Sequence, residues 1–187
     1  MQRLRHEAEA NPSVDIRWHT VAYLHQDGPV LEVIAGLLHG PTGRLQRSIV
    51  LDQGLATEAD ASNEDRKYDG YFEITGEAKD AHTPEEVERA IENELVKLQK
   101  TPVSVDELQK VKNHYLTSTY RGLTANTAIM FRYAVADGTG DWREADRRDV
   151  KINAVTAADV QRVAGQYFTK ERRAVSIMTR KAGSKGG

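Results

Sequence analysis

The sequence of 187 residues contains no cysteine, which excludes a disulfide framework and any metal site built on thiolates. An excess of charge of one sign is also lacking, because 26 Lys and Arg residues face 28 Asp and Glu residues. With a net charge of −2, nothing favours nucleic acid or an anionic membrane as a partner. The longest apolar run, residues 30–38, is broken by Glu32, so we expect no membrane insertion.

No secretory signal peptide is visible in the N-terminal residues MQRLRHEAEANP, which have charges but no apolar core. We interpret residues 1–12 as a linker remnant, residues 13–181 as a single domain and residues 182–187 as a disordered tail. The compartment is left open by this interpretation. It is periplasmic if a signal was removed with a missing N-terminal part, and cytoplasmic otherwise.

Catalytic motifs are scarce. No two of the six histidines lie within five residues of each other, which excludes the H-E-x-x-H and H-x-x-E-H zinc patterns. His6-Glu7-x-Glu9 imitates a ligand set, but we expect its segment to be too poorly ordered to hold a metal.

There is no G-x-S-x-G serine elbow, and HGPTGR lacks the G-K-[ST] of a phosphate-binding loop. A run of glutamates is explained by the helix dipole and a solvated helix face: Glu85, Glu86, Glu88, Glu92 and Glu94. We therefore predict no catalytic residue and no metal ligand on this chain.

The first third of the chain predicts a strand followed by two helices. Apolar and polar side chains alternate over residues 14–24, which indicates a strand with one buried face. A helical apolar stripe follows over residues 27–38 and is interrupted by Gly-Pro-Thr-Gly at residues 40–43, the GPTG loop. We predict that this loop joins two helices, with Thr42 as N-cap of the second and Gly54 at its end. Four residues are expected to turn inward: Leu37, Leu38, Leu45 and Ile49.

The rest of the chain predicts a hairpin, a block of helices and a last strand. Residues 55–61 and 71–79 have strand-like composition and are joined by a polar segment rich in turn residues. Helices are expected to start at Thr83, Ser104 and Thr156, each followed three residues later by Glu or Asp, and over residues 125–136. Residues 173–180 then form a strand. This order predicts an α+β domain, an antiparallel sheet with helices packed on one face.

Three segments give the sequence a family resemblance. They are VLEVIAGLLHGPTGRLQRSIVLDQGLATEADA (residues 30–61), TPEEVERAIENELVKLQKTPVSVDELQKVKNHY (residues 83–115) and VTAADVQRVAGQYF (residues 155–168). In this order they resemble the second domain of a half-molecule in the pitrilysin/insulinase family of zinc peptidases, in a match from Val14 to Met178. Mitochondrial processing peptidase is a relative in that family. The resemblance implies a LuxS/processing-peptidase-like metallohydrolase domain.

The resemblance also implies partners and a missing cofactor. In such enzymes each half consists of two α+β domains, and two halves enclose a peptide substrate. Zinc is bound by the first domain of the half, so it belongs to the parent enzyme, and no cofactor is expected on this chain. The expected partners are the zinc-bearing domain of the same polypeptide, a second half-molecule or partner subunit, and the peptide. An apolar patch should be exposed on this chain where the zinc-bearing domain covers it.

The same resemblance marks candidate residues of the peptide chamber. The GPTG loop occupies the position of a loop implicated in substrate handling, although a helix end at Gly40 and a cap at Thr42 explain these residues structurally. Substrate-assisting relatives carry an Arg and, seven residues later, a Tyr; here Val50 and Thr57 stand instead, and neither stabilises an oxyanion. The candidate chamber residues are Gly40, Thr42, Gly43, Val50 and Thr57.

Two functions remain open at this point. In the first, the chain is the C-terminal, non-catalytic domain of a zinc metalloendopeptidase, where it shapes the peptide chamber and docks the zinc-bearing domain. In the second, it is a structural or assembly module from a catalytically degenerate, processing-peptidase-like subunit. A free-standing peptide-binding domain is a third, weaker interpretation. In each case the chain alone is expected to be inactive.

Overall fold

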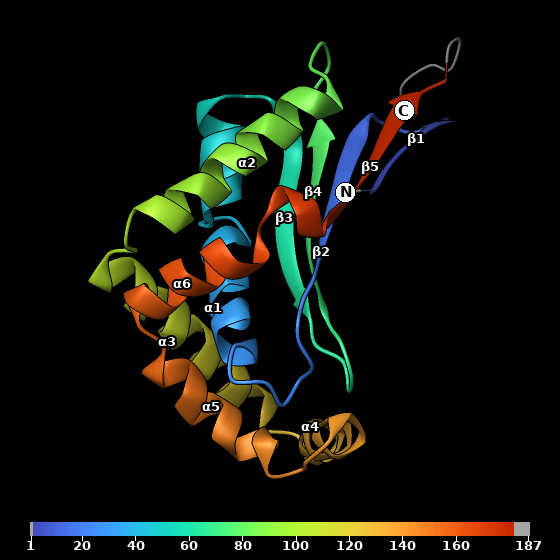
Figure 1. The fold of residues 1–187 in the computed structure, drawn as a ribbon. Helices are drawn as coiled ribbons and strands as arrows, with labels where there is room; N and C mark the ends of the chain where they lie inside the picture. The colour runs from blue at the N-terminus through green and yellow to red at the C-terminus, as the bar shows by residue number, and fades with distance from the viewer. Residues whose placement is uncertain (1, 182–187) are drawn as a thin grey trace.

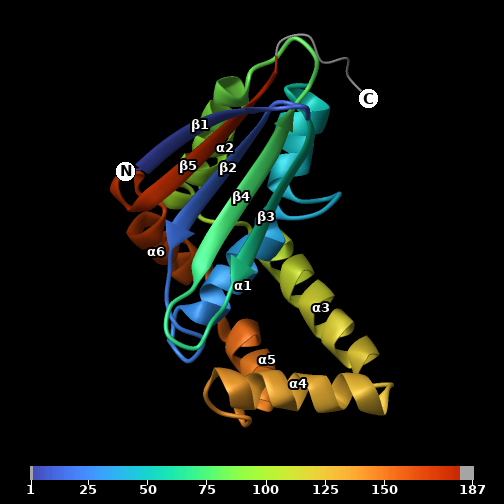
Figure 2. The ribbon, with the colours of Figure 1, turned by 90° about the vertical axis from the view of Figure 1, so that its right-hand side faces the viewer.

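The computed structural model describes residues 2–181 and shows a sheet covered on one face by helices (Figure 1). The strands are β1 (Gln2–Ala8), β2 (Ser13–His19), β3 (Ala56–Glu64), β4 (Tyr71–Ala78) and β5 (Arg173–Arg180). Their order across the sheet is β1-β5-β2-β4-β3, so β3 forms one edge (Figure 2). The predicted α+β class is confirmed. The predicted tail, residues 182–187, lies outside the described residues.

Strand β2 sets the register at the centre of the sheet. It is antiparallel to both neighbours, and Ile16 lies opposite Ile74 of β4 and Val175 of β5. The apolar side chains of β2 are fully buried, while those between them face away from the helices. A slip by one residue would turn the whole apolar set to solvent, so the alternation in the sequence fixes the pairing.

Strand β1 lies within residues 1–12, which we interpreted as a linker remnant. The expectation that the segment around His6 is poorly ordered is wrong, because His6 pairs with Met178 in a parallel ladder with β5. The sheet is therefore mixed rather than purely antiparallel. The sequence of β1 did not predict a strand, because almost all of its side chains are exposed and no buried apolar face alternates with a polar one. Arg3 fastens the strand to the helical layer through Glu88, at 2.8 Å.

Helices cover one face of the sheet, and α4 and α5 extend beyond the ends of the strands (Figures 1 and 2). They are α1 (Gly28–Leu38), the π-helix η1 (Gln46–Asp52), α2 (Pro84–Lys100), α3 (Val105–Gly122), α4 (Asn126–Thr139), α5 (Glu144–Ala154), α6 (Ala157–Tyr167) and the short 3₁₀ turn η2 (Lys170–Arg172). Capping boxes are confirmed at Thr83 and Thr156, and the Ser104 hydroxyl accepts the Glu107 N–H. Helix α5 was not predicted. Within residues 2–181, no helix is long and apolar enough to cross a membrane.

The core lies between the sheet and helices α1, α2 and α6. At its centre Trp18 and Phe72 both contact the Phe168 ring, with ring centroids 5.4 and 4.8 Å away. The inward orientation expected around the GPTG loop is confirmed, since four side chains are at most 2% exposed: Leu37, Leu38, Leu45 and Ile49. These contacts hold α1 and η1 against the sheet and place the loop between them.

Candidate functional site: a groove beside the edge strand

The GPTG loop joins α1 to η1, as the sequence predicted. Gly40 has φ +79°, a left-handed conformation that would cost any residue with a Cβ about 1–2 kcal/mol. Gly43 is needed for a different reason, since a Cβ there would overlap the carbonyl oxygens of Leu38 and His39. Both glycines therefore serve the reversal of the chain between two buried helices.

The expected N-cap at Thr42 is wrong. The chain is helical from Arg44 onward, and the first helical hydrogen bond runs from the Arg47 N–H to the Gly43 carbonyl, at 3.1 Å. Gly43 therefore precedes the helix, and Thr42 remains in the exposed part of the loop. The helix then widens to π geometry, which no local sequence pattern announces. Gly54 ends it with φ +64°, as expected.

The loop is fastened to the edge strand by Asp60 of β3. One carboxylate oxygen of Asp60 lies 2.6 Å from Nδ1 of His39 and accepts the Gly40 N–H at 3.3 Å. His39 is the residue that follows α1, so these two bonds connect the helix end, the loop and the strand. The loop is consequently held against β3 rather than free in solvent.

A groove of about 1150 Å³ lies below the loop, between α1 and β3 on one side and α3 and α4 on the other. Of the candidate chamber residues, Gly40 and Thr42 line it. Gly43 is buried, and Val50 packs half-buried against the core from η1. Thr57 is exposed near the start of β3 and donates to Glu77 at 2.8 Å. A chamber role for Val50 and Thr57 thus stays a prediction.

The end of the groove next to the GPTG loop is lined by charged side chains, and two of them, Arg44 and Glu107, form an ion pair with each other. Arg44 donates two hydrogen bonds to Glu107, at the start of α3, both at 2.7 Å. This bidentate contact spans the groove wall and neutralises both charges. Arg47, Lys110 and Asp106 complete the charged lining at this end.

The other end of the groove contains residues that the sequence did not single out. Glu32 of α1, Asn63 of β3, Tyr115 of α3 and Arg132 of α4 line it. Burial, the dominant cause, and the nearby Glu32 carboxylate raise the pKa of Tyr115 to about 12, so its hydroxyl stays protonated. One signal was available: Glu32 is the only charged residue in an otherwise apolar helix. The residues around Glu32 come from distant parts of the sequence, so no local pattern could have predicted that they meet.

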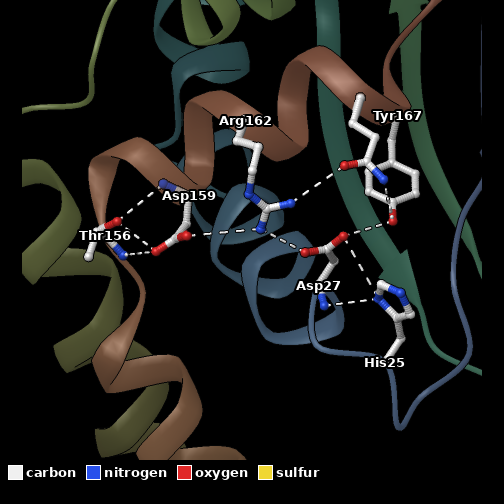
Figure 3. Close-up of polar contacts among 7 residues, drawn as sticks. His25, Asp27, Thr156, Asp159, Arg162 and Tyr167 are labelled. Atoms are coloured by element: carbon white, nitrogen blue, oxygen red, sulfur yellow. Dashed lines mark hydrogen bonds and ion pairs between the residues drawn. The ribbon is translucent and has the colours of Figure 1, made fainter.

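A second polar cluster ties the start of α1 to α6 (Figure 3). The Asp27 carboxylate is almost fully buried and accepts hydrogen bonds from Arg162 at 2.7 Å and Tyr167 at 2.9 Å. Nδ1 of His25 accepts the Asp27 N–H at 3.1 Å. Both carboxylate oxygens of Asp27 are engaged, which suits a structural cross-link between helices better than a reactive group.

The described residues do not fit a zinc site. Within residues 2–181, no three His, Asp or Glu side chains converge in a group that holds a metal. Four histidines each lie near a single carboxylate instead, as in the pairs His39–Asp60 and His82–Glu86. A catalytic zinc requires three protein ligands around an open position, so these side chains provide no zinc-dependent step.

The sequence matches the family model described as the peptidase M16 inactive domain over residues 2–115. The chain belongs to this family. It is thus a non-catalytic M16 peptidase domain, in agreement with the pitrilysin/insulinase resemblance seen in the sequence. No curated protein sequence matches it.

Solved structures share the fold of this M16 domain at low sequence identity. A protease from Helicobacter pylori is 19% identical with a TM-score of 0.90, over 95% of this chain and 44% of its own length. The inactive peptidase domain of a candidate zinc protease from Bordetella parapertussis is 23% identical with a TM-score of 0.82, over 93% and 92% of the two chains. A chain of complex III from Candida albicans is 18% identical with a TM-score of 0.75, over 94% and 44%. This M16 domain therefore spans less than half of the Helicobacter and Candida chains.

Proposed function

We propose that this M16 domain is a non-catalytic part of a zinc metalloendopeptidase, where its groove forms one wall of the peptide chamber. The observation that carries the proposal is the groove of about 1150 Å³ bordered by the GPTG loop. A cavity of this size accommodates several residues of an extended peptide. In the parent enzyme the zinc-bearing domain supplies the chemistry, and this domain holds the substrate.

The position of β3 supports a peptide in this groove. It is the last strand at its side of the sheet, and four consecutive residues of it line the groove, from Asp60 to Asn63. The free edge of a sheet offers backbone donors and acceptors to an added extended strand. The GPTG loop and α3 then provide side-chain contacts on either side of such a peptide.

Helix α4 supports the docking of a second domain. It contributes a single buried residue, Ala136, and its large apolar side chains Met130, Phe131 and Val135 are more than half exposed. An apolar helix that buries so few of its side chains within the domain is typical of an interface with another domain. We propose that the zinc-bearing domain covers this helix in the full protein, in line with the greater length of the Helicobacter relative.

The alternative is a structural or assembly role in a degenerate processing-peptidase-like subunit. Val50 and Thr57 are compatible with it, because the resemblance implies that a half without the Arg and Tyr either follows the zinc-bearing domain in the same polypeptide or belongs to a degenerate subunit. The similarity to a chain of complex III is compatible with such a role. In that case a partner subunit, rather than a peptide, occupies the groove.

A groove-filling variant tests the proposal against this alternative. Ala128 is exposed on α4 and lines the groove, whereas Ala158 is exposed on α6 away from it. We expect Ala128→Trp to weaken the binding of fluorescent ten-residue peptides at least about tenfold, since it displaces the peptide. Ala158→Trp should bind as the wild type does. Equal affinities for both variants, or no binding of any peptide, would favour the assembly role.

A further inference from the structure

Glu32 is an unusual residue for its position. It lies in the second turn of α1 among side chains that form the core, and it is the only charged residue of that helix. About 35% of its side chain remains exposed, and it lines the groove. A ligand in the groove can therefore reach this carboxylate.

The nearest cation to Glu32 is already engaged elsewhere. Arg148 of α5 lies 3.8 Å from the Glu32 carboxylate, too far for a hydrogen bond. The same guanidinium binds the Asp65 carboxylate directly, donates to the Tyr23 carbonyl at 3.2 Å and stacks on the Tyr23 ring at 4.8 Å. Arg148 is thus held by Asp65 and Tyr23, and it compensates Glu32 only in part.

The other charges around this end leave an excess of negative charge. Arg132 faces the groove from α4 and is paired with Asp149 of α5 at 2.9 Å. Three carboxylates, on Glu32, Asp65 and Asp149, therefore share two guanidinium groups. Burial raises the pKa of Glu32 most. Arg148 and a hydrogen bond from Asn63 lower it, and the carboxylates of Asp65 and Glu64 raise it. Ionised Glu32 is unfavourable here until another cation approaches.

The groove beside Glu32 suits a long basic side chain. Ala35, Gly36 and Val111 line the middle of the groove and present an apolar surface for the methylene stem of Lys or Arg. The opposite end carries Arg47 and Lys110, which disfavour a second cation there. The surroundings do not provide the ligand set of a metal ion, as the described residues show no such group.

We propose that Glu32 binds the Lys or Arg side chain of a peptide lying in the groove and so gives this domain a preference for basic peptides. The proposal rests on the proposed function, because it requires a peptide in the groove. Glu32 is thus a specificity residue that was not among the chamber residues predicted from the sequence. The α4 helix and β3 then enclose the peptide, and Glu32 fixes its register along the groove.

The test compares two peptides that differ at one position. Fluorescein-labelled decapeptides of Ala, Ser and Thr carry either Lys or Gln at the centre, and their affinities for the 187-residue chain are measured by fluorescence anisotropy. We expect the Lys peptide to bind about fivefold to tenfold more tightly, as a charge-assisted contact predicts. Glu32→Gln should lower the affinity for the Lys peptide toward that for the Gln peptide and so remove the preference.

Asp106→Asn provides the matched control. It removes the same charge from the same groove, but at the end next to the GPTG loop, and should retain the Lys preference. Thermal melts verify that both variants are folded. The inference is overturned if wild type shows no Lys preference or Glu32→Gln keeps it. If the peptides bind without preference and Ala128→Trp abolishes binding, the proposed function stands and only the role of Glu32 fails. If no peptide binds, both fail.

Discussion

Asp27 and Tyr167 lie 140 positions apart and meet at 2.9 Å, where the Tyr167 hydroxyl donates to the Asp27 carboxylate (Figure 3). The contact joins the first turn of α1 to the last turn of α6. Burial and the bond to Asp27 raise the pKa of Tyr167 to about 12, so the hydroxyl remains a donor at neutral pH. Helices α1 and α6 are therefore cross-linked at one end by a single buried carboxylate.

Removing the Tyr167 hydroxyl should destabilise the domain. We expect Tyr167→Phe to lower the free energy of unfolding by about 1 kcal/mol, the usual net worth of a buried hydrogen bond. Urea denaturation measures the change. Tyr133→Phe is the matched control, because its hydroxyl also contacts a carboxylate, Asp146 at 2.9 Å, but on the surface. Equal effects of the two substitutions would contradict the structural role of the buried contact.

Asp27 should make stability fall in acid. Burial by itself would raise the pKa of Asp27, but hydrogen bonds from Arg162 and Tyr167 outweigh it and lower the pKa. A carboxylate with a lowered pKa stabilises the fold above its unfolded pKa of about 4, and this contribution is lost as the pH falls. The stability advantage of the wild type over Asp27→Asn should therefore be constant above about pH 5 and shrink progressively as the pH falls below it. An advantage independent of pH would refute this assignment.

Glu32 should show the opposite dependence. Its pKa is raised, chiefly by burial, so ionisation destabilises the folded chain as the pH rises through the folded pKa. We expect Glu32→Gln to be more stable than the wild type at neutral pH and equal to it near pH 3, below both pKa values. Thermal unfolding at several pH values measures the difference. A loss of stability at neutral pH would show that Glu32 supports the fold rather than a ligand.

The reversal at the GPTG loop should be intolerant of a side chain at Gly43. A Cβ there overlaps two carbonyl oxygens, so Gly43→Ala is expected to cost about 1–3 kcal/mol, as for an overpacked core. Gly122, at the end of α3, has open space around its Cβ position. Gly122→Ala should be neutral or stabilising, because it reduces the entropy of the unfolded chain. Urea denaturation of both variants distinguishes steric overlap from a general effect of alanine.

The 187-residue chain alone should be inactive as a peptidase. Its described residues offer no zinc ligand set. We expect no cleavage of fluorogenic peptides and no stoichiometric zinc after dialysis, measured by mass spectrometry of the metal content. Cleavage that is lost on chelation, or one tightly held zinc per chain, would contradict the non-catalytic assignment.

Local patterns predicted the elements whose side chains alternate between core and solvent. Strand β2 and helix α1 were found for this reason, and the capping boxes placed the starts of α2 and α6. Helix α5 was missed because it buries only two apolar side chains, Ala145 and Ile152, and because a buried arginine, Arg148, anchors it to Asp65 just after β3. The chemistry of Glu32 depends on Asn63, Asp65 and Arg148, which come from distant parts of the chain. No local window contains that information, although a lone Glu in an apolar helix points to its position.

The parallel pairing of β1 with β5 has a consequence for the order of folding. Strand β5 lies between β1 and β2, the first two of the described strands, although it comes last among the described elements in chain order. Until residues 173–180 leave the ribosome, β1 lacks its neighbour and β2 has an open edge on that side. Such non-local closure is slow and leaves strand edges exposed to other chains. Chains truncated before Arg173 therefore expose the unpaired edge of β2, and we expect them to be more prone to aggregation than the 187-residue chain.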